Sequence, residues 1–184
     1  MLKNRTLILV IFIVSSALPG CAGKSTGGKG DPAVASGKVI SGVPFVKQKD
    51  KFCGPAAMAS VLAYYGDNIT QEEIAEKVYT PKLDGALISD MENFARESGY
   101  KAETVNGDAS AIEKEIDDGV PVILLVDRGK WMVSVPHYYV VYGYDTGKGA
   151  FIVNTGDERG VEMPFGRLDG EWEKMNRLML IVKK

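Results

Sequence analysis

The sequence predicts an α+β fold, with helices in the first half of the folded chain and an antiparallel sheet in the second. Segments with helical caps and apolar faces occupy 54–118, whereas β-branched and aromatic runs occupy 121–183. Elements that are segregated in this way favour a sheet whose strands run antiparallel and pack against the helices. The chain has 184 residues, of which 45% are hydrophobic, and this suffices for one domain with its own core.

Each predicted element is supported by local signals. The first helix, 54–65, carries Pro55 in its first turn, where the missing N–H would be unpaired in any case. The second helix, 70–79, starts with a capping box formed by Thr70 and Glu73. The remaining predicted helices are 87–98 and 108–118, and the predicted strands are 121–127, 137–145, 150–154 and 177–183.

Composition excludes some classes of function. The formal net charge is −2 and the basic residues are scattered, which argues against a nucleic-acid partner. The sequence contains no internal repeat, no glycine-rich phosphate loop and no cluster of metal ligands. We therefore expect no cofactor, no metal ion and no nucleic acid.

The first twenty residues have the character of a signal peptide. Lys3 and Arg5 precede the apolar run 7–14, which is too short to span a bilayer. The LPGC at 18–21 resembles the lipobox of bacterial lipoproteins, which implies that Cys21 is lipidated and becomes the new N-terminus. An ordinary secretory signal and a transmembrane anchor are the alternatives.

The expected organisation is a lipoprotein signal peptide at 1–20, a flexible tether at 21–38 and a folded domain at 39–184. The tether is rich in Gly, Ser, Lys and Ala and has few apolar side chains to bury. A lipidated Cys21 would hold the domain at the membrane of the bacterial cell envelope. Since Ala22 is not acidic, the lipoprotein resemblance implies the outer membrane in an organism with two membranes.

Cys53 and His137 are candidates for nucleophilic catalysis. Cys53 stands immediately before the first helix, whose free N–H groups and partial charge, about half a unit, favour a thiolate. His137 is the only histidine of the chain, opens a strand, and would supply the proton shuttle that a thiolate nucleophile needs. The alternatives are a small buried cysteine and a structural histidine.

These residues carry a resemblance to a known family. CGPAAMASVLAYYG at 53–66, HYYVVYGYD at 137–145 and the upstream Gln48 resemble the papain-like cysteine peptidases of the bacteriocin-processing, double-glycine-leader family. The resemblance covers about 43–155 and implies a papain-like fold with a Cys–His pair.

The resemblance also implies roles for individual residues. Cys53 would be the nucleophile and His137 the general acid–base. Gln48 would donate to the oxyanion together with the backbone N–H of Cys53. Gln48 lies one position closer to the cysteine than is usual, and Phe52 stands where the family often has Asp. A solvated loop amide is the alternative for Gln48.

The family uses Asp or Asn after the strand that follows the histidine, so Asn154 and Asp157 are the candidates for orienting His137. If 137–144 and 150–154 form a hairpin with an even-numbered loop, His137 and Asn154 share a face of the sheet. An odd-numbered loop would place Asp157 there instead. Both TG and TGKG are plausible turns. Each has an even number of residues, so we favour Asn154.

The sequence therefore predicts an envelope-anchored cysteine peptidase that hydrolyses peptide or amide bonds of a peptide or protein substrate through a thioester. Two alternatives remain. An amine in place of water would give a transglutaminase-like acyltransferase, and loss of turnover would leave a peptide-binding module. Exporters of the resembling family carry this domain ahead of membrane-spanning and nucleotide-binding parts, which this sequence does not contain, so we expect a stand-alone role.

Overall fold

A seven-stranded antiparallel sheet organises the fold. The computed structural model describes residues 37–184, so the predicted signal peptide, Cys21 and most of the predicted tether lie outside the described residues. Neighbouring strands follow the order β4-β9-β5-β6-β7-β8, and β1 pairs with the C-terminal end of β6. The strands are β1 Gly37–Val39, β4 Lys101–Asn106, β5 Val122–Asp127, β6 Pro136–Asp145, β7 Ala150–Asn154, β8 Val161–Pro164 and β9 Leu178–Lys183.

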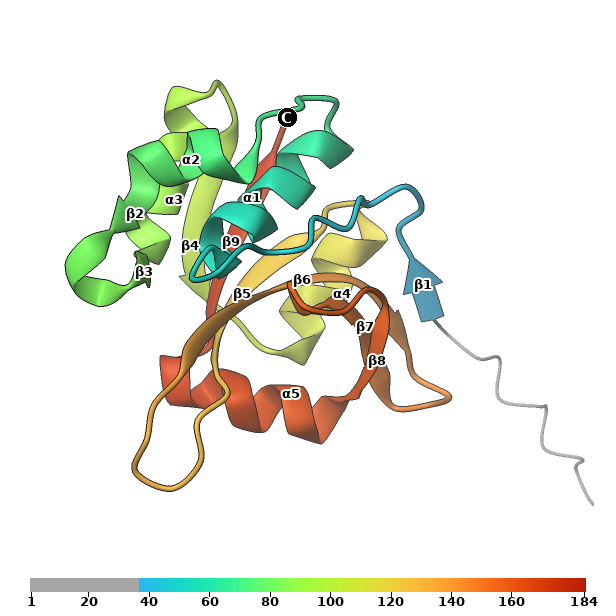
Figure 1. The fold of residues 1–184 in the computed structure, drawn as a ribbon. Coiled ribbons are helices and arrows are strands. Elements are labelled where there is room, and N and C mark those ends of the chain that lie inside the picture. The colour runs from blue at the N-terminus through green and yellow to red at the C-terminus, as the bar shows by residue number, and fades with distance from the viewer. Residues whose placement is uncertain (1–36) are drawn as a thin grey trace, which may run out of the picture. The chain divides into compact units, whose positions relative to one another are not determined.

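Helices cover both sides of this sheet, with α1, α2 and α3 on one side and α5 on the other (Figure 1). A short hairpin of β2 (Tyr79–Thr80) and β3 (Gly85–Ala86) stands beside α1 and is joined by the 3-10 turn η1 (Pro81–Leu83). The remaining elements are α1 Cys53–Tyr64, α2 Gln71–Val78, α3 Ile88–Glu97, α4 Ala109–Asp117, α5 Phe165–Trp172 and the 3-10 turn η2 Glu173–Met175. Within residues 37–184, none of the helices has the length and apolar character needed to cross a membrane.

Helix α1 occupies the centre of the fold. Residues 54–62 are all buried, and the helix packs between β6 on one side and α2 and α3 on the other. A helix that is apolar on every side is stable only in such a buried position. The start of α1 therefore has a fixed place against the sheet.

The predicted α+β fold is confirmed. The four predicted helices and four predicted strands are present, and their ends differ from the predictions by no more than one residue. The predictions missed β4, an edge strand whose one buried residue is Ala102, and α5, which contains two glycines and is held by the buried Leu168 and Trp172. They also missed β8 and the short strands β1, β2 and β3. Gly37 and Lys38, which were assigned to the tether, already pair with β6.

The β6–β7 hairpin departs from the predicted register. Its loop, 146–149, has an even number of residues, as one of the two predicted turns requires. A β-bulge, however, shifts the register between Val141 and Gly143. Beyond the bulge, Asn154 lies on the face of the sheet opposite to His137. The prediction that these two residues share a face is therefore wrong, because one extra residue inverts the alternation of side chains.

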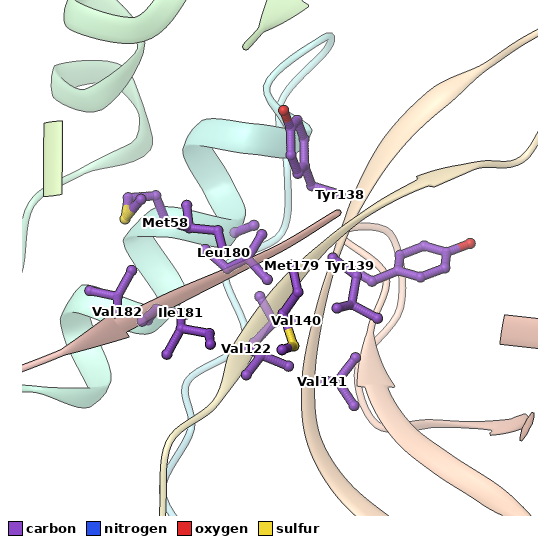
Figure 2. Packing of buried hydrophobic residues seen from close by; sticks show 14 of the residues in the cluster. Met58, Val122, Tyr138, Tyr139, Val140, Val141, Met179, Leu180, Ile181 and Val182 are labelled. Carbon is purple, nitrogen blue, oxygen red and sulfur yellow. The ribbon is translucent and has the colours of Figure 1, made fainter. Parts of the chain in front are cut away.

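Strand β6 separates two environments close to His137. Figure 2 shows Tyr138 and Tyr139 pointing to opposite sides of the strand. The hydroxyl of Tyr138 donates to the carbonyl oxygen of Ala86, beside α1, across 2.9 Å. The hydroxyl of Tyr139 donates to the carboxylate of Glu171 in α5 across 3.0 Å. Both tyrosines are buried, so Tyr138 fixes the strand against the β2–β3 hairpin and Tyr139 fixes it against α5.

Candidate active site

Cys53 is the first residue of α1, and its thiol is free and half-buried. Burial raises the pKa of the thiol, and this is the largest effect. The backbone N–H groups of Tyr138, Gly54 and Cys53 and the charge of Arg128 lower the pKa by less. The net pKa is therefore raised. The N–H groups of the helix start favour the thiolate, as predicted, but the loss of hydration on burial outweighs them, so the pKa of Cys53 is not lowered.

The close approach of α1 to the sheet depends on Gly54. A Cβ atom at this position would lie 2.8 Å from Sδ of Met91 and 3.2 Å from the ring of Tyr138. Pro55 follows in the first turn, where no N–H is needed. The Gly-Pro that follows Cys53 thus lets the start of α1 pack closely against the side chains of Met91 and Tyr138.

His137 is buried at the start of β6, with 6% of its surface exposed. Its Nε2 lies 2.7 Å from the carbonyl oxygen of Thr155. Because a carbonyl oxygen can only accept a hydrogen bond, Nε2 carries the proton and Nδ1 keeps its lone pair in the neutral ring. Burial lowers the pKa of His137 more than the Thr155 carbonyl raises it, and the charge of Arg128 lowers it further. The imidazole is therefore a neutral base with Nδ1 available.

The structure brings Cys53 beside the strand that carries His137 but does not join the two side chains. The thiol lies by the N–H of Tyr138, the residue that follows His137. The imidazole packs edge-on against the ring of Tyr139, with 5.5 Å between centroids, and directs Nε2 to Thr155. Within the described chain no hydrogen bond links the thiol to the imidazole. Burial favours the neutral form of both groups, since it raises the pKa of Cys53 and lowers the pKa of His137.

Asn154 makes no hydrogen bond to the imidazole within the part of the chain that the structure describes. Its amide nitrogen donates to the carbonyl oxygen of Pro44 across 3.4 Å, and its Oδ1 accepts from the N–H of Gly160 across 3.1 Å. The side chain is buried, with 3% exposed. In this structure Asn154 ties the end of β7 to the segment that precedes α1.

Asp157 reaches the histidine only through Arg128. The carboxylate of Asp157 lies 3.0 Å from Nη1 of Arg128, and the same Nη1 lies 3.4 Å from Nε2 of His137. The group that fixes the ring is the backbone carbonyl of Thr155. Sequence reasoning missed both Arg128 and Thr155, since one is among many scattered cations and the other acts through its backbone.

Gln48 lies in the segment before α1 and contacts the turn after Thr155. Its backbone N–H donates to the carbonyl oxygen of Gly156 across 2.9 Å. Its side-chain Oε1 is buried and has no hydrogen-bond partner within residues 37–184. A Cβ atom on Gly156 would lie 2.4 Å from this oxygen, and φ at Gly156 is +83°, so only glycine fits here.

Gln71, the first residue of α2, fixes the backbone on both sides of Gln48. Its Oε1 accepts from the N–H of Lys49 across 2.8 Å, and its Nε2 donates to the carbonyl oxygen of Lys47 across 3.0 Å. The side chain is buried, with 8% exposed. Sequence reasoning missed Gln71 because a polar residue after the Thr70 cap looks like any other residue of a first helical turn.

A mainly apolar cavity of about 560 Å³ opens beside Cys53. Its walls come from the β3 region, from the β5–β6 loop and from the sheet, and they include Leu83, Leu87, Leu125, Val135 and Tyr138. A cavity of this size and character suits apolar side chains of a ligand. No group of three or more His, Cys, Asp or Glu side chains in residues 37–184 is placed to hold a metal ion.

Comparisons with known proteins agree with this fold. Residues 40–179 match the Peptidase_C39 like family. The peptidase domain of Streptococcus ComA, a bi-functional ABC transporter involved in a quorum sensing pathway, is 27% identical, with a TM-score of 0.62 over 77% of this chain and 98% of that chain. A search of curated proteins finds no match.

Two further solved structures share the fold. A double glycine motif protease from an AMS/PCAT transporter, solved with its leader peptide, is 23% identical, with a TM-score of 0.63 over 80% of this chain and 98% of that chain. A protein from Bacillus anthracis described as a C39-like peptidase is 18% identical, with a TM-score of 0.66 over 81% of this chain and 98% of that chain. At these identities the likeness is one of fold alone.

Proposed function

Because the chain belongs to the Peptidase_C39 like family, we propose that it is a cysteine peptidase in which Cys53 attacks the carbonyl carbon of a peptide bond. The observation that carries this proposal is the position of Cys53, which begins a buried helix at the edge of an apolar cavity. The helix start supplies N–H groups to a developing anion, and the cavity supplies a place for an apolar side chain of a peptide or protein substrate.

The proposed first step begins from a neutral pair. Burial favours the uncharged forms of both Cys53 and His137. Substrate binding is therefore proposed to precede charge separation. The sulfur and Nδ1 are brought together while Nε2 keeps its bond to the Thr155 carbonyl, Nδ1 takes the thiol proton, and the sulfur forms a bond to the carbonyl carbon. The Thr155 carbonyl, which already accepts from Nε2, stabilises the imidazolium that results.

In the proposed later steps, a thioester forms and is hydrolysed, and Cys53 and His137 regain their starting protonation states. The N–H of Cys53 and the side-chain amide of Gln48 donate hydrogen bonds to the carbonyl oxygen as it becomes negatively charged. The C–N bond breaks as Nδ1–H of His137 protonates the leaving amine, and a thioester remains. Water gives its proton to Nδ1 and attacks the thioester carbon, which releases the carboxylic acid product and regenerates the thiol.

Asn154 enters this proposal as a positioning residue. Its two hydrogen bonds connect Pro44, four residues before Gln48, to Gly160 beyond the β7 end. Direct orientation of the ring is assigned to the Thr155 carbonyl. Asp157 is assigned an electrostatic effect: its carboxylate, paired with Arg128, raises the pKa of His137.

A lipid anchor at Cys21 is a second part of the proposal and rests on the sequence alone, since Cys21 lies outside the described residues. We propose that the domain is held at the cell envelope, on the outer membrane where two membranes exist. Cys21→Ser should shift the protein to a soluble or uncleaved form. Unchanged acyl labelling and membrane fractionation of this variant would reject the anchor without affecting the peptidase proposal.

The peptidase proposal is tested by reacting the purified chain with a thiol electrophile and with a diverse peptide library. Hydrolysis products that appear with the wild type and disappear with Cys53→Ala support it. Incorporation of a labelled amine in place of water would indicate an acyltransferase instead. Binding of peptides without turnover, in wild type and variant alike, would leave a peptide-binding module.

A further inference from the structure

The loop between β5 and β6, residues 128–135, exposes three consecutive apolar side chains. Trp131 is 103% exposed, Met132 100% and Val133 67%. Figure 1 shows this loop extending from the sheet beyond the layer of α5. Full exposure of a tryptophan beside a methionine costs solvation free energy, so this tip differs from the scattered apolar residues of an ordinary surface.

The tip is held by the fold and is not a loose segment. The buried carboxylate of Asp127 accepts hydrogen bonds from the N–H groups of Gly129 and Val135, across 2.7 and 2.8 Å. The N–H of Val133 closes the turn onto the carbonyl oxygen of Lys130 across 3.2 Å. Because these bonds fix both ends and the turn itself, the exposure of Trp131 between them is a built feature.

Gly129 gives independent support for a defined loop conformation. A Cβ atom at this position would lie 1.9 Å from the carbonyl oxygen of Val133, so the two arms of the loop touch here. Lys174, in the turn after α5, donates from Nζ to the carbonyl oxygen of Gly129 across 3.0 Å. The loop is therefore braced from a second element as well.

The charged residues of the loop itself are all basic. Residues 128–136 contain two basic residues and no acidic residue. Arg128 is paired with Asp157, which leaves Lys130 and the adjacent Lys174 as the exposed cations beside the apolar tip. An amphipathic tryptophan flanked by lysines is the arrangement that suits the interface of an anionic bilayer.

The tip is separate from the proposed substrate cavity. Ser134 and Val135, at the base of the loop, line the cavity beside Cys53, whereas Trp131, Met132 and Val133 are not among its lining residues. A role for the tip in holding the substrate side chain therefore has no support in the described structure. The cavity and the tip are connected only because they share one loop.

We propose that the tip of the β5–β6 loop docks on the surface of an anionic lipid bilayer. Trp131 and Met132 enter the interfacial region, while Lys130 and Lys174 lie among the lipid phosphates. This contact orients the domain so that the cavity beside Cys53, whose wall is the base of the same loop, opens close to the membrane surface. The contact is independent of the chemistry at Cys53.

The two tryptophans of the chain make a direct test available. Trp172 is 1% exposed and Trp131 fully exposed, so only Trp131 can change its solvation at a membrane. The full chain is mixed with phosphatidylcholine vesicles that contain brominated acyl chains, with or without phosphatidylglycerol. Emission from Trp131 is obtained as the difference between the wild type and Trp131→Phe. We expect a blue shift and quenching with phosphatidylglycerol vesicles and neither with phosphatidylcholine alone.

Matched variants separate the tip from any other attachment of the chain. The ratio of quenched to unquenched Trp131 measures how much of the protein is docked. Lys130→Gln and Lys174→Gln should each lower this ratio about fivefold, because each removes a charge that is attracted to the anionic lipid. High salt should lower it as well, because it screens the same attraction. Cys53→Ser should leave the quenching unchanged. Met132→Ser should weaken it without changing the thermal unfolding of the chain, since this side chain is fully exposed.

Several outcomes would overturn the proposal. Trp131 that stays unquenched while the chain sediments with the vesicles would show that the tip faces water in the attached protein. Equal quenching with and without phosphatidylglycerol would exclude an anionic surface as the partner. A blue shift on addition of a substrate peptide, with none on addition of vesicles, would assign the tip to peptide binding.

Discussion

Gln71 holds Gln48 in place by bonding the backbone on either side of it, to the carbonyl of Lys47 and the N–H of Lys49. Both bonds come from one planar amide, so the peptide segment cannot shift without breaking them together. The hydroxyl of Ser60 adds a bond to the carbonyl of Pro44 in the same segment. Helices α1 and α2 thus position the proposed oxyanion donor from two directions.

Replacing Gln71 by alanine should displace Gln48 and lower kcat about tenfold. KM should change little, because an oxyanion donor stabilises mainly the transition state. Gln48→Ala should lower kcat roughly 100-fold, the effect of removing such a donor outright. Steady-state kinetics on one peptide substrate measure both. Loss of two buried hydrogen bonds in Gln71→Ala should also cost about 1–3 kcal/mol of unfolding free energy.

A double variant distinguishes positioning from a general loss of stability. In the Gln48→Ala background, Gln71→Ala should cause no further loss of kcat, because the group that it positions is absent. Glu76→Ala, on the exposed side of the same helix, is the matched control and should behave as the wild type. Fully multiplicative effects in the double variant would mean that Gln71 does not act through Gln48.

Asn154 is expected to affect turnover by holding the segment before Gln48 against the end of β7. Asn154→Ala should lower turnover by about tenfold, since the segment before Gln48 loses its contact with the end of β7. Asn154→Asp should be as damaging, because a carboxylate can accept from the N–H of Gly160 but cannot donate to the carbonyl of Pro44.

The aspartate variant is the decisive measurement for this residue. Substantial activity in Asn154→Asp would mean that the side chain accepts the ring N–H of His137 in the working enzyme, as the family resemblance implied. Asp157→Ala should be milder than Asn154→Ala in turnover, because Asp157 contacts the histidine only through Arg128. A severe loss in Asp157→Ala would assign the orienting role to that carboxylate.

Much of the fold was predictable because its elements carry local signals. The capping box of Thr70 and Glu73 is present at the start of α2, and Asp108 caps α4 as expected. Strand β4 and helix α5 were missed because their sequences are polar or glycine-containing and are held by tertiary burial. The β-bulge near Gly143 was not predictable, because it occurs where β1 approaches β6 and a Cβ atom would lie 3.0 Å from the carbonyl of Lys38.

The candidate site was predictable where side chains carry the chemistry. Cys53 was found because it precedes a helix, and His137 because no other histidine exists. The partner of the ring was sought among side chains, whereas the structure uses the Thr155 carbonyl, which leaves no mark in the sequence. The helix-start effect on the pKa of Cys53 was predictable, whereas the larger and opposite effect of burial depends on packing that a sequence does not display.

Gly54 links the fold to the site, and its substitution should affect stability. Gly54→Ala should lower the unfolding free energy by about 1–3 kcal/mol, because the added Cβ would overlap Met91 and press on Tyr138. Gly170→Ala is the matched control, since a Cβ there meets no atom within 4 Å. The control should gain about 0.5–1 kcal/mol from helix propensity. Equal effects in a denaturant titration would show that α1 can move away from the sheet.

The pH dependence of kcat/KM should report the lowered pKa of His137. Burial and the charge of Arg128 both lower it, so the acid limb should lie below the usual histidine value of about 6.5. Arg128→Met should move this limb to higher pH, because it removes a positive charge. Asp157→Asn should move it to lower pH, because Asp157 raises the pKa of the ring. Identical limbs in all three proteins would show that another group is being titrated.

The lowered pKa of His137 also makes the stability of the fold depend on pH. The folded protein holds His137 neutral at pH values where the unfolded chain already binds a proton. The unfolding free energy should therefore fall as the pH drops below about 6.5, and this contribution should level off below the folded pKa. His137→Gln should reduce the acid-side slope relative to the wild type. An unchanged slope in a pH series of denaturant titrations would contradict a depressed pKa.

The alkylation rate of Cys53 should rise with pH through a transition above the free-thiol value of about 8.5, because burial outweighs the N–H groups and the Arg128 charge that favour the thiolate. Arg128→Met should move the transition to still higher pH, since it removes one of the stabilising charges. His137→Ala should change it little, because no hydrogen bond joins the two side chains within residues 37–184. A transition well below 8.5 that disappears in His137→Ala would instead establish a preformed thiolate–imidazolium pair. Charge separation would then precede substrate binding, and the neutral starting state proposed for the reaction would be wrong.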